Sequence, residues 1–290
     1  MKQNHDLWGN PIVEDELLRD KFIEPPFSVL DTKGGAWQNR KRIWKRIGIA
    51  SHLGRDGVVV INNSFDGDKY GRGAMPEVSI FDPALCELMY RWFVPVGGTI
   101  LDPFAGGSVR GIVANYLSFK YTGVDIRQEQ VDSNREQALD ILEVNNQPQW
   151  YVGDSNEVLD SGFVNRFDFV FSCPPYADLE VYSKLKGDIS NMKYNEFLVA
   201  YENIITKSCK LLKSGGYACF VVGDIRDKDG FYRNFVGATK KAFLNTGIKL
   251  YNEAVLLQPL GTAMLRAAKV FNAGKKLTKV HENVLIFKKP

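Results

Sequence analysis

Two short segments of this sequence carry residue types whose spacing could bind and transform a small molecule. The first spans residues 101–108 and reads Leu-Asp-Pro-Phe-Ala-Gly-Gly-Ser. Its glycines allow the backbone to approach a ligand closely, and the carboxylate of Asp102 could accept a hydrogen bond from a cationic amine. The pattern departs from the Gly-x-Gly-x-x-Gly fingerprint of dinucleotide-binding proteins. The segment therefore predicts a ligand cradle and disfavours a phosphate ligand.

The second segment spans residues 172–176 and reads Ser-Cys-Pro-Pro-Tyr. Pro174 and Pro175 fix the backbone and lack N–H groups, which predicts a rigid arm with carbonyls before it and an aromatic face after it. A planar amine on a nucleobase needs an acceptor for its protons and a ring against which the base stacks. A Pro-Pro turn with a packed tyrosine is the structural alternative.

Both segments follow short apolar runs that alternate with helical patterns from Thr99 onward. This alternation predicts an α/β fold, a doubly wound, Rossmann-like sheet of about seven strands. One helix should begin with Asp82 as its cap and Pro83 at its first position, and a later helix should end before residues 213–216. The expected strands are 99–102, 121–126, 150–152, 167–172, 217–222, 249–257 and 283–288.

Acidic residues follow the first three expected strands. Asp102 ends the first, Asp125 lies at the end of the second, and Asp154 follows the third. The carboxyl ends of parallel strands meet at one edge of a sheet, and Asp125 stands roughly where a ribose-binding acid belongs in a doubly wound fold. Each acid taken singly could equally cap a helix. Their joint placement predicts one ligand site at this edge.

The segment that begins at Asp102 resembles the cofactor motif of amino-group DNA methyltransferases, usually Asp-Pro-Phe-x-Gly-x-Gly, with Ser108 replacing the last glycine. The resemblance covers roughly residues 79–290 and implies a methyltransferase sheet whose last strand is antiparallel. It implies S-adenosylmethionine as cofactor, with Asp125 at its ribose hydroxyls and Asp154 at its adenine amine. The helix that begins at Phe81-Asp82-Pro83 would help to hold the cofactor carboxylate. The residues implied to surround the methionine part are Asp102, Pro103, Phe104, Ala105, Gly106 and Gly107, and Ser108 is a further implied cofactor-binding residue.

The Pro-Pro segment resembles the catalytic tetrapeptide of the same enzymes, in which Asp, Asn or Ser precedes Pro-Pro and an aromatic residue follows. Cys173 occupies the first position here, with Ser172 one residue earlier. A thiol is a weak acceptor, whereas the main-chain carbonyl of Cys173 can accept an amine proton. The resemblance implies methyl transfer to the exocyclic amine of a flipped adenine or cytosine in double-stranded DNA, as in restriction–modification systems. The implied catalytic segment is Ser172, Cys173, Pro174, Pro175 and Tyr176.

The first part of the chain lacks sustained periodicity. We therefore expect an N-terminal appendage at residues 1–78, with a mobile loop at residues 62–73, before a methyltransferase domain at residues 79–290. Within the appendage, cations are interleaved with Trp37 and Trp44, which suits a phosphate backbone. Alternatively, the two tryptophans, at helical i, i+7 spacing, anchor an amphipathic helix to the main domain. The expected nucleic-acid contacts are Arg40, Lys41, Arg42 and Lys45.

A second basic stretch, at residues 266–279, lies between the last two expected strands and includes Lys269, Lys275 and Lys276. Connections of this length in a compact domain are usually functional or disordered. His281 and Glu282 start the last strand and could join the acceptor pocket, although a lone histidine there is more often a packing residue.

Three other interpretations compete with DNA amino methylation. The first is an RNA methyltransferase of the same build, although the sequence has no recognisable RNA-binding module. The second makes Cys173 a nucleophile that attacks a pyrimidine ring, although carbon-methylating enzymes place the cysteine after a proline. The third is a nucleic-acid-binding module with an inactive methyltransferase fold, against which the retained acids and the Pro-Pro-Tyr segment argue.

The amino-acid composition is typical of a globular protein. The 290 residues are 44% hydrophobic and 24% charged, which is ordinary for a globular chain. The net charge of +3 is small, so attraction to nucleic acid must come from local clusters. The four cysteines form no Cys-x-x-Cys pair, the N-terminus is polar, and no run of about 18 apolar residues occurs. We expect a cytoplasmic protein with reduced thiols and without a metal site or a membrane span.

Overall fold

The computed structural model describes residues 22–49, 60–61, 81–160, 163, 167–176, 180–261 and 263–290. The loop expected at residues 62–73 lies outside these ranges. In chain order the elements are β1 (Val29–Asp31), α2 (Gly35–Arg46), β2 (Val60–Ile61), α3 (Pro83–Phe93), β3 (Thr99–Asp102), α4 (Val109–Tyr116), β4 (Lys120–Asp125), α5 (Gln128–Ile141), β5 (Gln149–Val152), α6 (Ser155–Val158), β6 (Phe167–Ser172), β7 (Glu180–Val181), η3 (Ile189–Asn191), α7 (Tyr194–Leu211), β8 (Leu212–Val222), α8 (Phe235–Leu244), β9 (Lys249–Leu257), α9 (Ala263–Gly274) and β10 (His281–Lys288).

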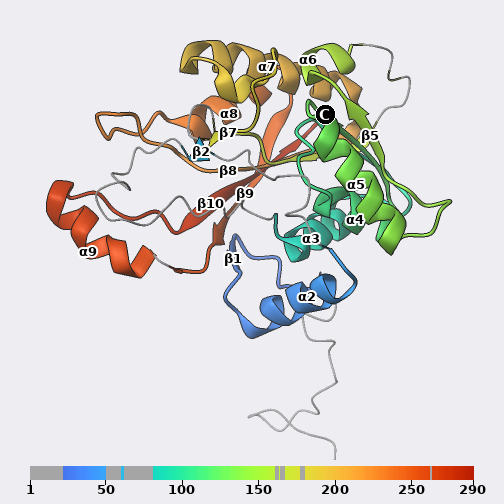
Figure 1. Ribbon diagram of the computed structural model, residues 1–290, viewed down its shortest axis with the longest axis horizontal. Helices are drawn as coiled ribbons and strands as arrows, with labels where there is room; N and C mark the ends of the chain where they lie inside the picture. The colour runs from blue at the N-terminus through green and yellow to red at the C-terminus, as the bar shows by residue number, and fades with distance from the viewer. Residues whose placement is uncertain are drawn as a thin grey trace, which may run out of the picture.

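An eight-stranded sheet runs through the molecule in the order β1-β9-β10-β8-β6-β3-β4-β5 (Figure 1). β3 pairs in parallel with β4 on one side and β6 on the other, whereas β10 is antiparallel to both β8 and β9. The predicted doubly wound sheet with an antiparallel last strand is therefore confirmed. The chain leaves β3 in one direction toward β5 and returns to its other side with β6. Ligands of open α/β sheets bind at such a switch point.

The strand ranges expected at β3, β6 and β9 match the structure, but β8 begins earlier than expected. The preceding helix α7 ends at Leu211, before residues 213–216 as expected, and those residues belong to β8. Leu212 pairs with Phe167, and the N–H of Gly215 donates to the carbonyl of Lys289 at 2.9 Å. The end of the chain thus supplies hydrogen-bond partners that no local pattern reveals, and they extend the strand through two glycines.

Side chains alternate between the two faces of the sheet and form two cores. Ile100 and Phe169 belong to the core under α3 and α4, whereas Leu101 and Val170 belong to the core under α7 and α8. Figure 1 shows these two groups of helices on opposite sides of the sheet. Burying one such side chain contributes about 1.5–3 kcal/mol, so both layers hold the strand ends in place. No helix within the described ranges is long and apolar enough to cross a membrane.

Two elements of the expected N-terminal appendage are built into the sheet and its cover. β1 forms an edge strand parallel to β9, and α2 packs on α3. Trp37 and Trp44 of α2 are buried, and their indole N–H groups donate to Asp82 at 3.1 Å and to Glu87 at 2.7 Å. The alternative interpretation of the two tryptophans, as anchors of an amphipathic helix, is confirmed.

Candidate active site

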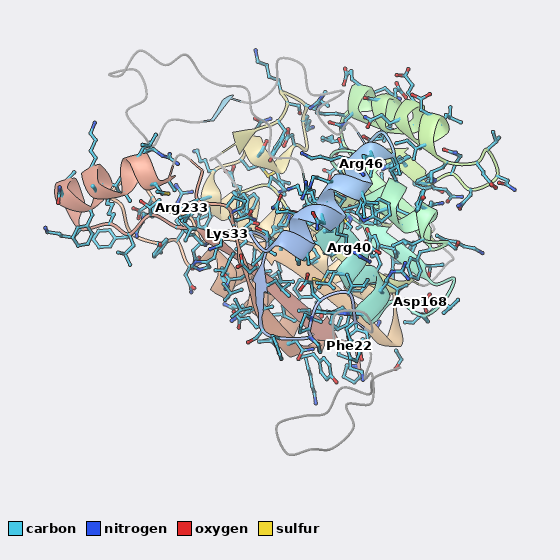
Figure 2. All side chains as sticks on the ribbon, turned by 90° about the horizontal axis from the view of Figure 1, so that it is seen from below. Phe22, Lys33, Arg40, Arg46, Asp168 and Arg233 are labelled. Atoms are coloured by element: carbon cyan, nitrogen blue, oxygen red, sulfur yellow. The ribbon has the colours of Figure 1, made fainter. Side chains whose placement is uncertain are left out.

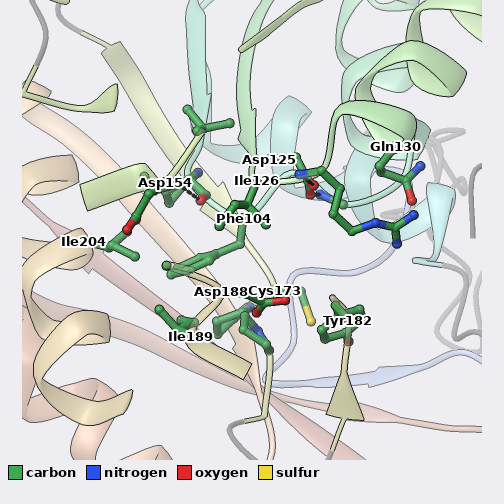
Figure 3. A pocket seen from close by; sticks show the side chains of 18 of the residues that line it. Phe104, Asp125, Ile126, Gln130, Asp154, Cys173, Tyr182, Asp188, Ile189 and Ile204 are labelled. Carbon is green, nitrogen blue, oxygen red and sulfur yellow. Dashed lines mark hydrogen bonds between the residues drawn. The ribbon is translucent and has the colours of Figure 1, made fainter. Parts of the chain in front are cut away.

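A cavity lies at the carboxyl ends of β3, β4, β5 and β6, the edge at which the sequence predicts a ligand site. Parallel pairing of β3 with β4 and of β4 with β5 brings the three strand-end acids to this edge. Figure 3 shows Asp125, Asp154 and Cys173 around one space. The predicted site residues that line the cavity are Pro103, Phe104, Gly106, Asp125, Asp154, Cys173, Pro174, Pro175 and Tyr176.

The expected bond between Asp102 and a cofactor amine is corrected by the structure, because Asp102 is fully buried behind the cavity wall. One carboxylate oxygen accepts from Arg110 Nε at 2.5 Å and from the Tyr121 hydroxyl at 2.8 Å. The other accepts from the Ser172 hydroxyl at 2.5 Å and from the Phe104 N–H at 3.1 Å. Four donors fill the four acceptor sites of a carboxylate. Asp102 therefore links β3 to β4, β6 and α4, and it has no acceptor left for a ligand.

Other predicted residues also act from behind the wall. Ser172 is fully buried and donates to Asp102, so its side chain is not the acceptor for a target amine. Ser108 is equally buried and donates to Gln137 at 3.0 Å. Ala105 and Gly107 are buried and do not line the cavity. These residues support the loop and do not contact a ligand in the cavity.

Arg110, at the start of α4, is a site residue that sequence reasoning missed. Its Nη2 donates to the carbonyls of Phe104 at 2.7 Å and Ala105 at 2.9 Å, and its guanidinium lies 4.6 Å from the ring centroid of Phe81. Burial alone would lower the pKa of Arg110, but the Asp102 carboxylate beside it keeps the pKa above its ordinary value. Arg110 also lines the cavity. A lone cation among the apolar residues after the glycines was the available sequence signal.

Asp125 fixes the glycine loop from the end of β4. Its carboxylate accepts from the N–H of Gly106 at 2.8 Å and from the N–H of Arg127 at 2.9 Å. Gly106 has φ +50°, a left-handed conformation that favours glycine, and Asn134 donates to its carbonyl at 2.7 Å. Asp125 also lines the cavity, and each of its carboxylate oxygens has two acceptor sites, which suits a ligand hydroxyl.

Asp154 caps a helix and also lines the cavity, so the alternative interpretation as a helix cap is confirmed. Its Oδ1 accepts from the N–H of Asn156 at 2.8 Å and caps α6. Its Oδ2 accepts no hydrogen bond from any described residue, although Asp154 lines the cavity. Gly187 has φ +96° and lies so close that a Cβ there would meet this oxygen at 2.8 Å. One carboxylate oxygen at the cavity is thus available to a ligand donor.

Tyr176 is held by β10 as well as by the proline arm. Its hydroxyl donates to Glu282 Oε1 at 3.0 Å, and Gln258 donates to the other oxygen of Glu282 at 2.8 Å. Its ring lies edge-on to Phe235 with the centroids 6.0 Å apart. Glu282 lines the cavity, whereas His281 is not among the lining residues.

The segment before α7 forms part of the cavity wall. No pattern in the sequence predicted that it would reach the site. Tyr182, Asp188 and Ile189 line the cavity opposite Asp125 (Figure 3). Asp188 accepts from the hydroxyls of Ser183 and Ser190, both at 2.6 Å, so its carboxylate shapes the segment. These residues reach the site only because the chain after β7 folds back over the strand ends.

Two of the four cations expected to contact nucleic acid form ion pairs within the protein. Arg40 Nε lies 2.9 Å from Glu87, and Lys41 Nζ lies 3.1 Å from Asp82. Arg42 and Lys45 are exposed. Figure 2 shows Arg40 and Arg46 along α2, which lies across the body of the molecule. Contact between α2 and nucleic acid stays a prediction, with Arg42 and Lys45 as its exposed cations.

Comparisons with known proteins identify the fold. No family model and no curated protein matches the sequence. Among solved structures, TrmN from Thermus thermophilus has a TM-score of 0.50 and 16% identity, over 72% of this chain and 49% of that one. A TehB-like S-adenosylmethionine-dependent methyltransferase from Corynebacterium glutamicum has a TM-score of 0.43 and 14% identity, over 71% and 87%. The chain has the fold of S-adenosylmethionine-dependent methyltransferases. It spans about half the length of the TrmN structure.

A third similar structure contains bound S-adenosylmethionine. It is a candidate DNA modification methylase, also from Thermus thermophilus, complexed with S-adenosylmethionine, with a TM-score of 0.37 and 22% identity over 48% of this chain and 54% of that one. At 16% identity the likeness to TrmN shows the fold and says nothing of the substrate.

The cavity residues fit S-adenosylmethionine. Asp125 and the free Oδ2 of Asp154 can accept from hydroxyl and amine groups, and Ile126 and Ile204 offer apolar surface to a flat base. Arg110 Nη1 donates to no described residue, so it is available to a ligand carboxylate. The cofactor supplies an electrophilic methyl group when bound.

Proposed function

We propose that this chain transfers a methyl group from S-adenosylmethionine to the exocyclic amine of adenine or cytosine in double-stranded DNA. The observation that carries the proposal is the position of residues 173–176 at the end of β6, in the wall of the cavity that Asp125 and Asp154 also line. A rigid aromatic arm and the acids suited to the cofactor thus surround one space. Direct transfer between two bound partners needs positioning more than acid–base power.

The arm would position the target amine in two ways. The carbonyl of Cys173 accepts a hydrogen bond from the target amine, which orients the nitrogen lone pair, and the ring of Tyr176 stacks on the flipped base. Pro174 and Pro175 limit backbone motion at this point. Tyr176 is further fixed by Glu282 at 3.0 Å. The chain therefore contributes orientation, stacking and exclusion of water, and it forms no bond to the base.

The decisive experiment is transfer of a tritiated methyl group to duplex DNA and, in parallel, to RNA, followed by nucleoside analysis. We expect label on the amino group of adenine or cytosine from DNA. Label only on RNA nucleosides would favour the RNA methyltransferase alternative. Label on a ring carbon of a pyrimidine would contradict transfer to an amine.

The two cavity acids should contribute directly to cofactor affinity. We expect Asp154→Ala to weaken S-adenosylmethionine binding about tenfold or more, because a lost hydrogen bond to a charged acceptor costs about 1.5–3 kcal/mol. Asp125→Ala should weaken binding at least as much, since it also releases Gly106. Isothermal titration calorimetry measures both. Asp132→Ala, which removes an exposed acid on α5, is the matched control and should leave affinity unchanged. Unchanged affinity in both cavity variants would contradict the assigned cofactor site.

Cys173 should act through its backbone. We expect Cys173→Ser to keep methylation within about tenfold of the wild-type rate, because the change leaves the main chain and the volume nearly intact. Wild-type enzyme should form no denaturation-resistant adduct with DNA that contains a fluorinated cytosine. Mass spectrometry of the denatured protein checks this. An adduct together with an inactive Cys173→Ser variant would establish attack by the thiolate instead.

A further inference from the structure

The connection between β9 and β10 carries a helix that projects from the cavity edge. β9 runs parallel to β6 through the pairings of β10 and β8, so its carboxyl end lies at the same edge as the cavity. The connection returns to that edge at Lys279, whose Nζ donates to the carbonyl of Asp224 at 3.4 Å, and at Glu282 in the cavity wall. Between these points α9 extends away from the body (Figure 1). No residue of α9 is buried.

The charged residues of this connection are all positive. The sequence has no acid between Glu253 and Glu282, and all the charged residues in that interval are cations, namely Arg266, Lys269, Lys275, Lys276 and Lys279. Within the described part of the chain, Arg266, Lys275 and Lys276 form no ion pair. Cations without an acidic partner complement the negative charge of a phosphate backbone. α2 differs, because Arg40 and Lys41 are paired with acids of α3.

Large apolar side chains are exposed on the same helix. Met264 is 68% exposed, Leu265 is 77% exposed and Phe271 is 43% exposed. Proteins that distort DNA insert such side chains between base steps, and extraction of a base leaves a gap of this kind. Cations beside exposed apolar groups therefore favour a nucleic-acid duplex as the occupant over an apolar partner alone.

We propose that α9 and its flanking lysines form the surface that holds duplex DNA over the cavity, with Arg266, Lys275 and Lys276 on its phosphates. The proposal rests on the proposed function, since it names the surface that delivers the base to that site. It moves the main nucleic-acid contact from α2, where the sequence predicted it, to the cavity edge at the end of β9.

The test compares two triple variants with equal loss of charge. Arg266→Ala/Lys275→Ala/Lys276→Ala removes the α9 cations. Lys120→Ala/Lys210→Ala/Lys249→Ala removes three exposed lysines at the start of β4, the end of α7 and the start of β9, which is the opposite edge of the sheet. Affinities for a fluorescent DNA duplex and for a fluorescent RNA hairpin are measured by anisotropy at several salt concentrations. Cofactor affinity, thermal unfolding and light scattering are measured as well.

We expect the α9 triple variant to flatten the slope of log affinity against log salt by about 2.7, from about 0.9 for each lost phosphate contact. The control variant should keep the wild-type slope, and both variants should keep cofactor affinity and the unfolding temperature. Equal slopes in all three proteins, or equal flattening in both variants, would overturn the proposal. Loss of a dimer with unchanged DNA binding would overturn it in favour of a second copy, and tighter binding of an RNA hairpin would overturn DNA as the occupant. A changed slope in a protein that methylates no nucleic acid would refute only the proposed function.

Discussion

Arg110→Ala is expected to lower the free energy of unfolding by about 3–5 kcal/mol, because it leaves the Asp102 carboxylate buried without its cation. Asp102 is fully buried, and Arg110 Nε lies 2.5 Å from it. The substitution also frees the carbonyls of Phe104 and Ala105 at the start of the glycine loop, so cofactor affinity should fall as well. Urea unfolding and calorimetric titration measure the two effects.

Three further variants make this expectation specific. Arg135→Ala, which removes a half-exposed arginine of α5, should cost about 1 kcal/mol or less. Arg110→Lys keeps the positive charge but loses the planar guanidinium. Its free energy of unfolding should therefore fall less than that of Arg110→Ala and more than that of Arg135→Ala. Arg110→Met combined with Asp102→Asn should recover part of the loss, since no buried charge then lacks a partner. A loss for Arg110→Ala no larger than that for Arg135→Ala would show that the pair does not support the site.

Tyr176→Ala is expected to lower the rate constant of methyl transfer about 10- to 100-fold and to leave cofactor affinity nearly unchanged. Stacking of a base on an aromatic ring is worth about 1–3 kcal/mol, and about 1.4 kcal/mol corresponds to a factor of ten in rate. Single-turnover kinetics with saturating cofactor measure the rate. Tyr251→Ala, which removes a half-exposed ring near the amino end of β9, should have no effect.

Two conservative variants separate stacking from placement of the ring. Tyr176→Phe keeps the ring but loses the bond to Glu282, so its rate should fall less than that of Tyr176→Ala. Glu282→Gln keeps an acceptor for the hydroxyl and should resemble wild type more closely than Tyr176→Phe. Tyr176 also packs against Phe235, so thermal unfolding is recorded for each variant. If a variant loses both its methyl-transfer rate and its cooperative thermal unfolding transition, the alternative that Tyr176 is only a packing residue would be favoured.

Much of the fold followed from local patterns in the sequence. The strands β3 and β6 are short and largely apolar, and Asp82 with Pro83 starts α3 as expected. The extension of β8 through residues 213–216 did not follow, because its partners lie at the far end of the chain. The place of β1 in the sheet was missed for the same reason, since it depends on pairing with β9.

In the site too, some features follow from local sequence patterns and others depend on contacts between distant segments. The pattern of strands was enough to predict that three acids and the Pro-Pro-Tyr arm reach one edge, because parallel strands end on the same side of a sheet. The roles of these residues depend on contacts between distant segments. The donors from α4, β4 and β6 surround Asp102, so its carboxylate is satisfied internally, whereas Asp154 keeps one oxygen open to the cavity. A carboxylate binds whatever donors its neighbours bring within hydrogen-bonding distance, and those neighbours are set by packing between distant segments and not by spacing along the chain.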